Sequence, residues 1–99
     1  MTPLHYAAMQ GHCDIVELLL NNGLSGFLNK NMSNTPLHLA AENGHISLVK
    51  QLVFLGANPN IQNKDHLTPL HHAAQKGHFP IVEYLVNQNA DINIKDLYI

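Results

Sequence analysis

Apolar residues return at steps of three and four in three segments of the chain. The trios are Val16, Leu19 and Leu20, then Val49, Leu52 and Val53, then Val82, Leu85 and Val86. Such steps place the apolar side chains on one face of a helix. The pattern therefore predicts helices over residues 13–21, 46–55 and 79–88, each with one buried face. Pro80 lies in the first turn of the last one, where proline is tolerated.

A shorter segment precedes each of these helices and has its own start and stop signals. In one of them Thr35 and Pro36 precede Leu37, and Gly44 follows. Threonine is a good N-cap, proline suits the first helical position, and glycine ends a helix in the left-handed region. We predict helices over residues 3–10, 36–43 and 69–76. Alanines on their apolar stripe allow neighbouring helices to approach closely.

The start signal belongs to a repeated tetrapeptide. Thr-Pro-Leu-His begins at Thr2, Thr35 and Thr68, at intervals of 33 residues, and Gly-His follows at the same interval from Gly11. The period and the T-P-L-H-x-A signature resemble the ankyrin repeat family, and the resemblance covers the whole chain. It implies an all-α fold, an ankyrin repeat solenoid of stacked helix pairs with short β-hairpin loops.

Alignment on the threonine divides the single array, residues 1–99, into repeats. They are a partial repeat over 1–29, repeats over 30–62 and 63–95, and the start of a further repeat over 96–99. Hairpins are expected at about 58–67 and near 27–34, pointing away from the helices. The family usually has a glycine where this chain has Ser33 and His66, and Asn89 replaces another glycine. Both ends look cut, which suggests a fragment of a longer protein.

Composition excludes several classes of partner. The net charge is −2, with five lysines and no arginine, which gives no basic surface for nucleic acid. The longest aliphatic stretches, such as Leu18–Leu20, are too short for membrane insertion. No secretory signal is visible at the first residues, and the single cysteine, Cys13, cannot form an internal disulfide. We expect an intracellular, cytoplasmic protein with no cofactor.

Eight histidines raise the question of a metal site. Six of them occupy two repeated positions: His5, His38 and His71, and His12, His45 and His78. Equivalent side chains on stacked helices run parallel about 8–10 Å apart, whereas zinc ligands meet at one ion. We therefore expect no metal, and hydrogen bonds from the rings to the backbone and to neighbouring repeats. His66 and His72 are expected at the surface, with a partner contact at His72 as the alternative.

No set of catalytic residues is recognisable, so we expect no enzyme. Cys13 occupies a position that is apolar in the other repeats, which favours packing over reactivity. The resemblance adds Asn93 as a possible target of an intracellular asparaginyl hydroxylase, because Leu85, Asp91 and Ile92 precede it at suitable positions. The alternative is that Asn93 only hydrogen-bonds the hairpin backbone.

These features predict a non-catalytic module that binds a protein partner. In ankyrin repeat proteins, partners dock on the concave face of hairpin tips and first helices. Transferred one by one, the positions are Met9, Gln10, Asn22, Asn31, Met32, Asn34, Glu42, Asn43, Leu55, Lys64, Asp65, Leu67, Gln75, Lys76 and Gln88. Met32, Leu55 and Leu67 are the expected apolar anchors. The alternatives are a structural spacer, or a chain designed or shortened to study repeat folding. Uncapped ends also allow self-association.

Overall fold

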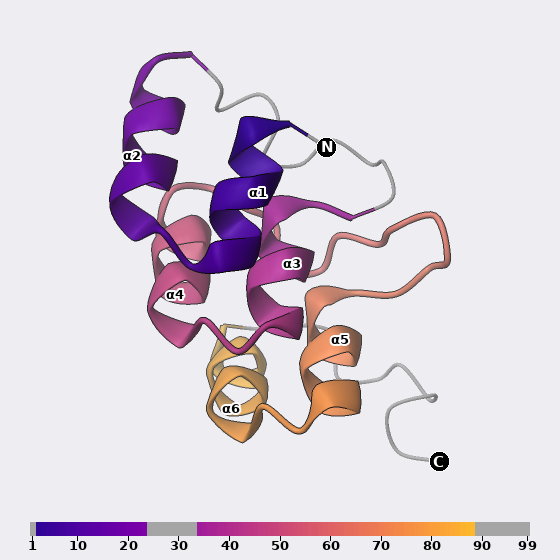
Figure 1. Cartoon of the computed structure of the whole chain (residues 1–99). Coiled ribbons are helices and arrows are strands. Elements are labelled where there is room, and N and C mark those ends of the chain that lie inside the picture. Colours follow the sequence, from indigo (N-terminus) through magenta and orange to yellow (C-terminus); the bar gives the residue numbers. More distant parts are fainter. Residues whose placement is uncertain (1, 24–33, 89–99) are drawn as a thin grey trace.

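A computed structural model describes residues 2–23 and 34–88 of the chain (Figure 1). Within these ranges it contains six helices: α1 (Pro3–Gln10), α2 (Cys13–Asn21), α3 (Pro36–Glu42), α4 (Ile46–Phe54), α5 (Pro69–Lys76) and α6 (Phe79–Asn87). All six predicted helices are confirmed. Three of them end one residue earlier than predicted, because Asn43, Leu55 and Gln88 are C-cap residues.

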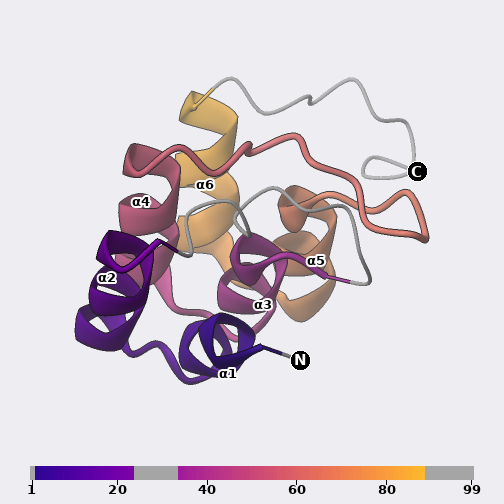
Figure 2. The same ribbon diagram turned by 90° about the horizontal axis from the view of Figure 1, so that it is seen from above.

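The helices form two layers. Figure 2 shows α1, α3 and α5 in one row, and α2, α4 and α6 in a second row beside it. A tight turn joins the two antiparallel helices of each pair, and we call the pairs α1–α2, α3–α4 and α5–α6 the first, second and third unit. The predicted all-α stack of helix pairs is confirmed.

The first helix of every unit begins in the same way. Thr35 is the N-cap of α3, and its hydroxyl oxygen accepts from the backbone N–H of His38. The His38 ring accepts in return from the Thr35 N–H, at 3.2 Å from Nδ1. These reciprocal bonds form a capping box with histidine at its third position, and they recur in α1 and α5. The left-handed glycines are also confirmed, with φ of 79° at Gly44.

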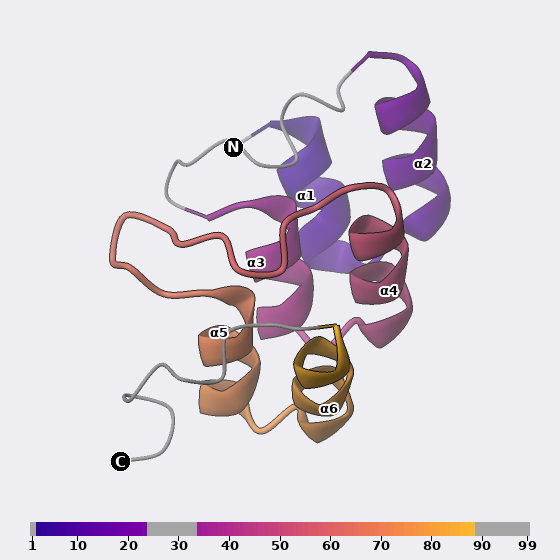
Figure 3. The same cartoon turned by 180° about the vertical axis from the view of Figure 1, so that it is seen from behind.

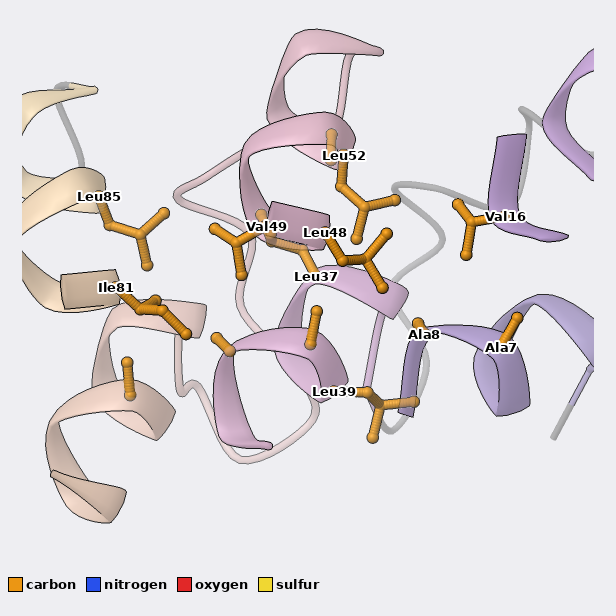
Figure 4. Packing of buried hydrophobic residues seen from close by; sticks show 14 of the residues in the cluster. Ala7, Ala8, Val16, Leu37, Leu39, Leu48, Val49, Leu52, Ile81 and Leu85 are labelled. Atoms are coloured by element: carbon orange, nitrogen blue, oxygen red, sulfur yellow. The ribbon is translucent and has the colours of Figure 1, made fainter. Parts of the chain in front are cut away.

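The core lies between the two layers and between successive units. Figure 4 shows Leu48 and Leu52 of α4 pointing toward Val16 of α2, and Ile81 and Leu85 of α6 on the other side of α4. All five side chains are buried. Each unit therefore completes its core with residues of the next, and the buried face of α4 contacts both neighbours.

The loop between α4 and α5 extends away from the helices, as predicted (Figures 1 and 3). It is closed by a turn in which the Asn63 N–H donates to the Leu67 carbonyl and the His66 N–H to the Asn63 carbonyl, each at 2.9 Å. His66 has a φ of 63° where the family usually places glycine. The described ranges contain no β-strand. The second expected hairpin, near 27–34, lies outside the described residues except for Asn34, as do Ser33, Asn89 and 96–99.

Candidate functional site

An open groove of about 420 Å³ crosses the C-terminal ends of the first helices. It is lined by Met9, Leu39, Glu42, Asn43, Lys76 and His78. Three units contribute to it, because these residues come from α1, α3, α5 and the turns after α3 and α5. Its lining combines two apolar side chains, Met9 and Leu39, with one acidic and one basic side chain. An open groove of this kind can receive a side chain of another protein.

Four of the six residues predicted at the first-helix ends line this groove: Met9, Glu42, Asn43 and Lys76. Gln10 and Gln75 are exposed beside them without lining it. Sequence reasoning missed Leu39 and His78. The sequence could have indicated Leu39, since the residue at its repeat position differs in every unit. It could not have indicated His78, because the same residue occupies that position in all three units.

The predicted residues of the hairpin lie at the turn before α5. Lys64 and Asp65 are exposed at its tip, and Leu67 is half-buried. The Leu67 carbonyl accepts from His38 Nε2 at 2.7 Å. The Asn34 side chain is hydrogen-bonded within the chain, because its oxygen accepts from Asn63 Nδ2 at 2.9 Å. Lys64 and Asp65 are therefore the more accessible contacts of this group.

The three residues predicted at the ends of the second helices do not join the groove. Asn22, Leu55 and Gln88 are the C-caps of α2, α4 and α6, and all three are exposed. Because the helices of a unit are antiparallel, these ends lie away from the C-terminal ends of the first helices (Figure 1). Three further predicted positions, Asn31, Met32 and Asn93, lie outside the described residues.

His72 is buried, so the expectation that it lies at the surface is wrong. Its Nε2 lies 3.2 Å from the Asn63 amide nitrogen, and its Nδ1 lies 3.9 Å from a Glu42 carboxylate oxygen. Its ring also meets the His38 ring edge to face, at 5.2 Å between centroids. Burial lowers the pKa of His72, although Glu42 acts in the opposite direction. Tyr6 at the equivalent position is exposed, so the sequence position alone could not reveal this burial.

Asn63 connects this buried histidine to the turn. Its side-chain oxygen accepts from the N–H groups of Asp65 and Leu67, at 2.9 and 3.1 Å. Its amide group donates to Asn34 and faces His72. The chain of contacts therefore runs from the hairpin turn through Asn63 and His72 to Glu42 in the groove. It joins the turn to the groove through two buried side chains, Asn63 and His72.

Four of the six repeated histidines connect successive units, as predicted. In the first position, Nε2 of His5 donates to the Asn34 carbonyl at 2.9 Å, and His38 donates to Leu67. In the second position, Nε2 of His45 donates to the Met9 carbonyl at 2.8 Å and Nε2 of His78 to the Glu42 carbonyl at 2.9 Å. Each of these bonds reaches an adjacent unit or the turn that leads into it.

Cys13 is a packed side chain, and the described residues hold no metal-binding group. The Cys13 thiol is partly buried and packs against the hydrophobic core, as predicted. In residues 2–23 and 34–88, no group of three His, Cys, Asp or Glu side chains is placed to hold a metal ion. The same ranges contain no helix long and apolar enough to cross a membrane.

Sequence comparison agrees with the stacked helix pairs and their repeated capping boxes. The family model for ankyrin repeats (3 copies) matches residues 1–63 and again residues 27–96. The chain belongs to the ankyrin repeat family. Domains of this family are generally protein–protein interaction modules and are typically non-catalytic. Comparison with curated proteins gives no match.

Proposed function

We propose that the chain binds a protein partner through the groove at the first-helix ends and the hairpin turn before α5, without catalysing a reaction. The groove that four of the predicted residues line is the observation that carries this proposal, and the contacts through Asn63 and His72 tie the turn to it. We place this activity inside the cell, in the cytoplasm.

Variation between units also supports this surface. The capping Thr, Pro and His are identical in the three units, whereas Met9, Glu42 and Gln75 share one repeat position and differ in chemistry. The capping residues serve folding, so they are the same in each unit. The position of Met9, Glu42 and Gln75 changes in charge and polarity while the capping residues stay the same, so its side chains can be suited to a partner.

The lining of the surface indicates the kind of contact it favours. Met9 and Leu39 offer an apolar centre, and Glu42, Lys64 and Lys76 supply charges of both signs around it. Protein interfaces commonly combine a desolvated apolar centre with a polar rim. A protein segment with an apolar side chain flanked by both charges therefore suits this surface better than a uniformly charged polymer.

Site-specific photo-crosslinking tests the proposal. A photoreactive amino acid replaces Lys64 or Lys76 on the proposed surface, and Glu17 or Glu83 on α2 and α6 as matched exposed controls. Each purified protein is irradiated in an extract of the source cells, and adducts are identified by mass spectrometry. We expect Lys64 and Lys76 to capture the same protein, and Glu17 and Glu83 to capture none of it.

Reversing the charge of Glu42 gives a second test of the proposed surface. Glu42→Lys is expected to reduce capture from Lys64, because Glu42 lines the groove and lies beside His72. Adducts formed only from Glu17 and Glu83 would instead place the interface on the second helices. The absence of a specific adduct at all four positions would favour the structural spacer.

A further inference from the structure

Two buried histidines, His38 and His72, contact each other but have different hydrogen-bond partners. Their rings meet edge to face, at 5.2 Å between centroids. Nε2 of His38 lies 2.7 Å from the Leu67 carbonyl, which can only accept, so His38 carries its proton on Nε2. Nε2 of His72 instead faces the side-chain amide of Asn63 at 3.2 Å. The position of the His72 proton therefore depends on the orientation of that amide.

The turn fixes the orientation of the Asn63 amide. Its oxygen accepts from the backbone N–H groups of Asp65 and Leu67, at 2.9 and 3.1 Å. A backbone N–H can only donate, so the oxygen must face the turn and the nitrogen must face His72. This nitrogen gives one hydrogen to the Asn34 oxygen at 2.9 Å and has a second for the ring. Nε2 of His72 is therefore the acceptor, and the neutral ring carries its proton on Nδ1.

The other side of the same ring faces the groove. Nδ1 of His72 lies 3.9 Å from a carboxylate oxygen of Glu42, which lines the groove. With its proton on Nδ1, the ring attracts this carboxylate while Nε2 accepts from the turn. The residues at the equivalent positions, Tyr6 and Leu39, have no pair of ring nitrogens that could do both. The third unit alone therefore combines the two contacts in one side chain.

Protonation of His72 is incompatible with this arrangement. A hydrogen on Nε2 would face the Asn63 NH₂ group, so two donors would oppose each other and the hydrogen bond would be lost. If the Asn63 amide turns over, its oxygen can accept from the charged ring. The N–H groups of Asp65 and Leu67 then lose their acceptor, which loosens the turn. The charged ring meanwhile attracts Glu42 more strongly.

Charged groups of both signs surround the His72 ring. They are Glu42 and His38 of α3, Asp65 of the turn, and His71 and Lys76 of α5. Desolvation by burial is the largest effect and lowers the pKa of His72 from its ordinary value of 6.5, whereas Glu42 acts in the opposite direction. The ring is therefore neutral at pH 7 and takes up its proton below pH 6.5.

We propose that neutral His72 is the positioning residue that holds the turn at residues 63–67 in place beside the groove, and that protonation of its ring releases the turn. Lys64 and Asp65 are exposed at the tip of this turn, so its release changes their placement relative to the groove. A partner that contacts both regions is then bound more weakly in mild acid. This consequence rests on the proposed function, whereas the ring proton and the response of the turn do not.

Nitrogen-15 NMR of the 99-residue chain locates the ring protons. Correlations from the carbon-bound ring hydrogens distinguish a protonated from an unprotonated ring nitrogen. At pH 7.5 we expect His72 to carry its proton on Nδ1 and His38 to carry its proton on Nε2. A neutral His72 with its proton on Nε2 would overturn the proposal.

A titration from pH 7.5 to 5.0 follows the release of the turn. We expect the backbone amide signals of Asp65 and Leu67 to move with the same midpoint as the His72 ring. Their protection from hydrogen exchange, corrected for the intrinsic effect of pH, should fall about fivefold. Glu42→Gln removes the charge that favours the protonated ring, so both midpoints should move together to lower pH. A turn midpoint that stays in place while the ring midpoint moves would separate the two events and contradict the proposal.

Two substitutions separate the effect of His72 from that of other histidines. In His72→Gln the side-chain oxygen can accept from Asn63 but cannot titrate, so the turn should keep its protection over the whole range. His66→Asn is the matched control, because His66 is exposed in the same turn and asparagine tolerates its φ of 63°. It should keep the wild-type response. An unchanged turn titration in His72→Gln, or its loss in His66→Asn, would overturn the proposal.

The photo-crosslinking experiment keeps this inference separate from the proposed function. Specific capture from Lys64 and Lys76, together with the wrong ring proton on His72, would reject only the inference. The expected ring proton and turn release, without a specific adduct, would reject only the proposed partner surface.

Discussion

His38 and Leu67 are joined by a hydrogen bond of 2.7 Å from the ring Nε2 to the backbone carbonyl. The other ring nitrogen, Nδ1, accepts from the N–H and the hydroxyl of Thr35. One buried imidazole therefore completes the cap of α3 and fixes the turn that leads into α5. The ring must be neutral with its proton on Nε2, because a protonated Nδ1 would face the Thr35 N–H.

Removal of this ring should destabilise the whole array. His38→Ala leaves the Thr35 N–H and the Leu67 carbonyl without their partner and opens a cavity at a side chain that is 0% exposed. We expect a loss of about 2 kcal/mol or more in the free energy of unfolding, measured by urea denaturation. His12→Ala is the control, because His12 is exposed, and it should cost less than about 0.5 kcal/mol. Equal midpoints for His38→Ala and the wild type would remove the role assigned to His38.

Stability should fall as the pH decreases below neutrality. Desolvation lowers the pKa of His38 from 6.5 to about 4, despite the opposing effect of the Leu67 carbonyl. Between these values the unfolded chain binds a proton that the folded chain excludes. The free energy of unfolding therefore decreases as the pH falls from 6.5 toward 4, by up to about 1.4 kcal/mol per pH unit. Burial of His72 acts in the same direction.

Urea midpoints at pH 7.0, 6.0 and 5.0 measure this dependence. His38→Gln removes the titrating ring and should reduce the slope, even though the variant starts from a lower stability. A variant with the full wild-type slope would show that the pH dependence arises from other groups.

The turn glycines provide a matched pair of substitutions. Gly44 has a φ of 79°, and a Cβ there would lie 2.9 Å from the His78 ring. Gly77 has a φ of 75°, with nothing within 4 Å of its added Cβ. Both alanine variants are strained by the backbone at about 1 kcal/mol, but only Gly44→Ala also displaces a ring. We expect Gly44→Ala to have the lower melting temperature, and the loss that Gly44→Ala causes to be smaller when it is measured in the His78→Ala background. Equal melting temperatures for the two single variants would contradict the contact.

Metal ions should leave stability unchanged. Four repeated histidines, His5, His38, His45 and His78, use Nε2 for bonds to carbonyls, and those of the first position use Nδ1 for the threonine cap. We expect the thermal unfolding curve to be the same with one equivalent of zinc and with a chelator. A stoichiometric, zinc-dependent rise in melting temperature would show that some of these rings bind metal.

The chain's own sequence determined the local structure. Thr-Pro starts, glycine stops and apolar steps of three and four act through contacts within a few residues, so they located all six helices to within one residue at each end. The 33-residue period added the stacking, because a unit with one uncovered apolar face needs a neighbour. Four of the predicted groove residues follow from the same periodicity, which brings equivalent helix ends to one side of the stack.

Only the tertiary structure decided which side chains of equivalent positions are accessible. Tyr6, Leu39 and His72 share one repeat position, yet Tyr6 is exposed while Leu39 and His72 are buried. His72 is covered because the turn around Asn63 folds over α5 and Glu42 lies beside it. These contacts join residues from different units, and a pattern read within one unit contains no information about the cover that its neighbour supplies. The link between groove and turn therefore appears only when the units are stacked.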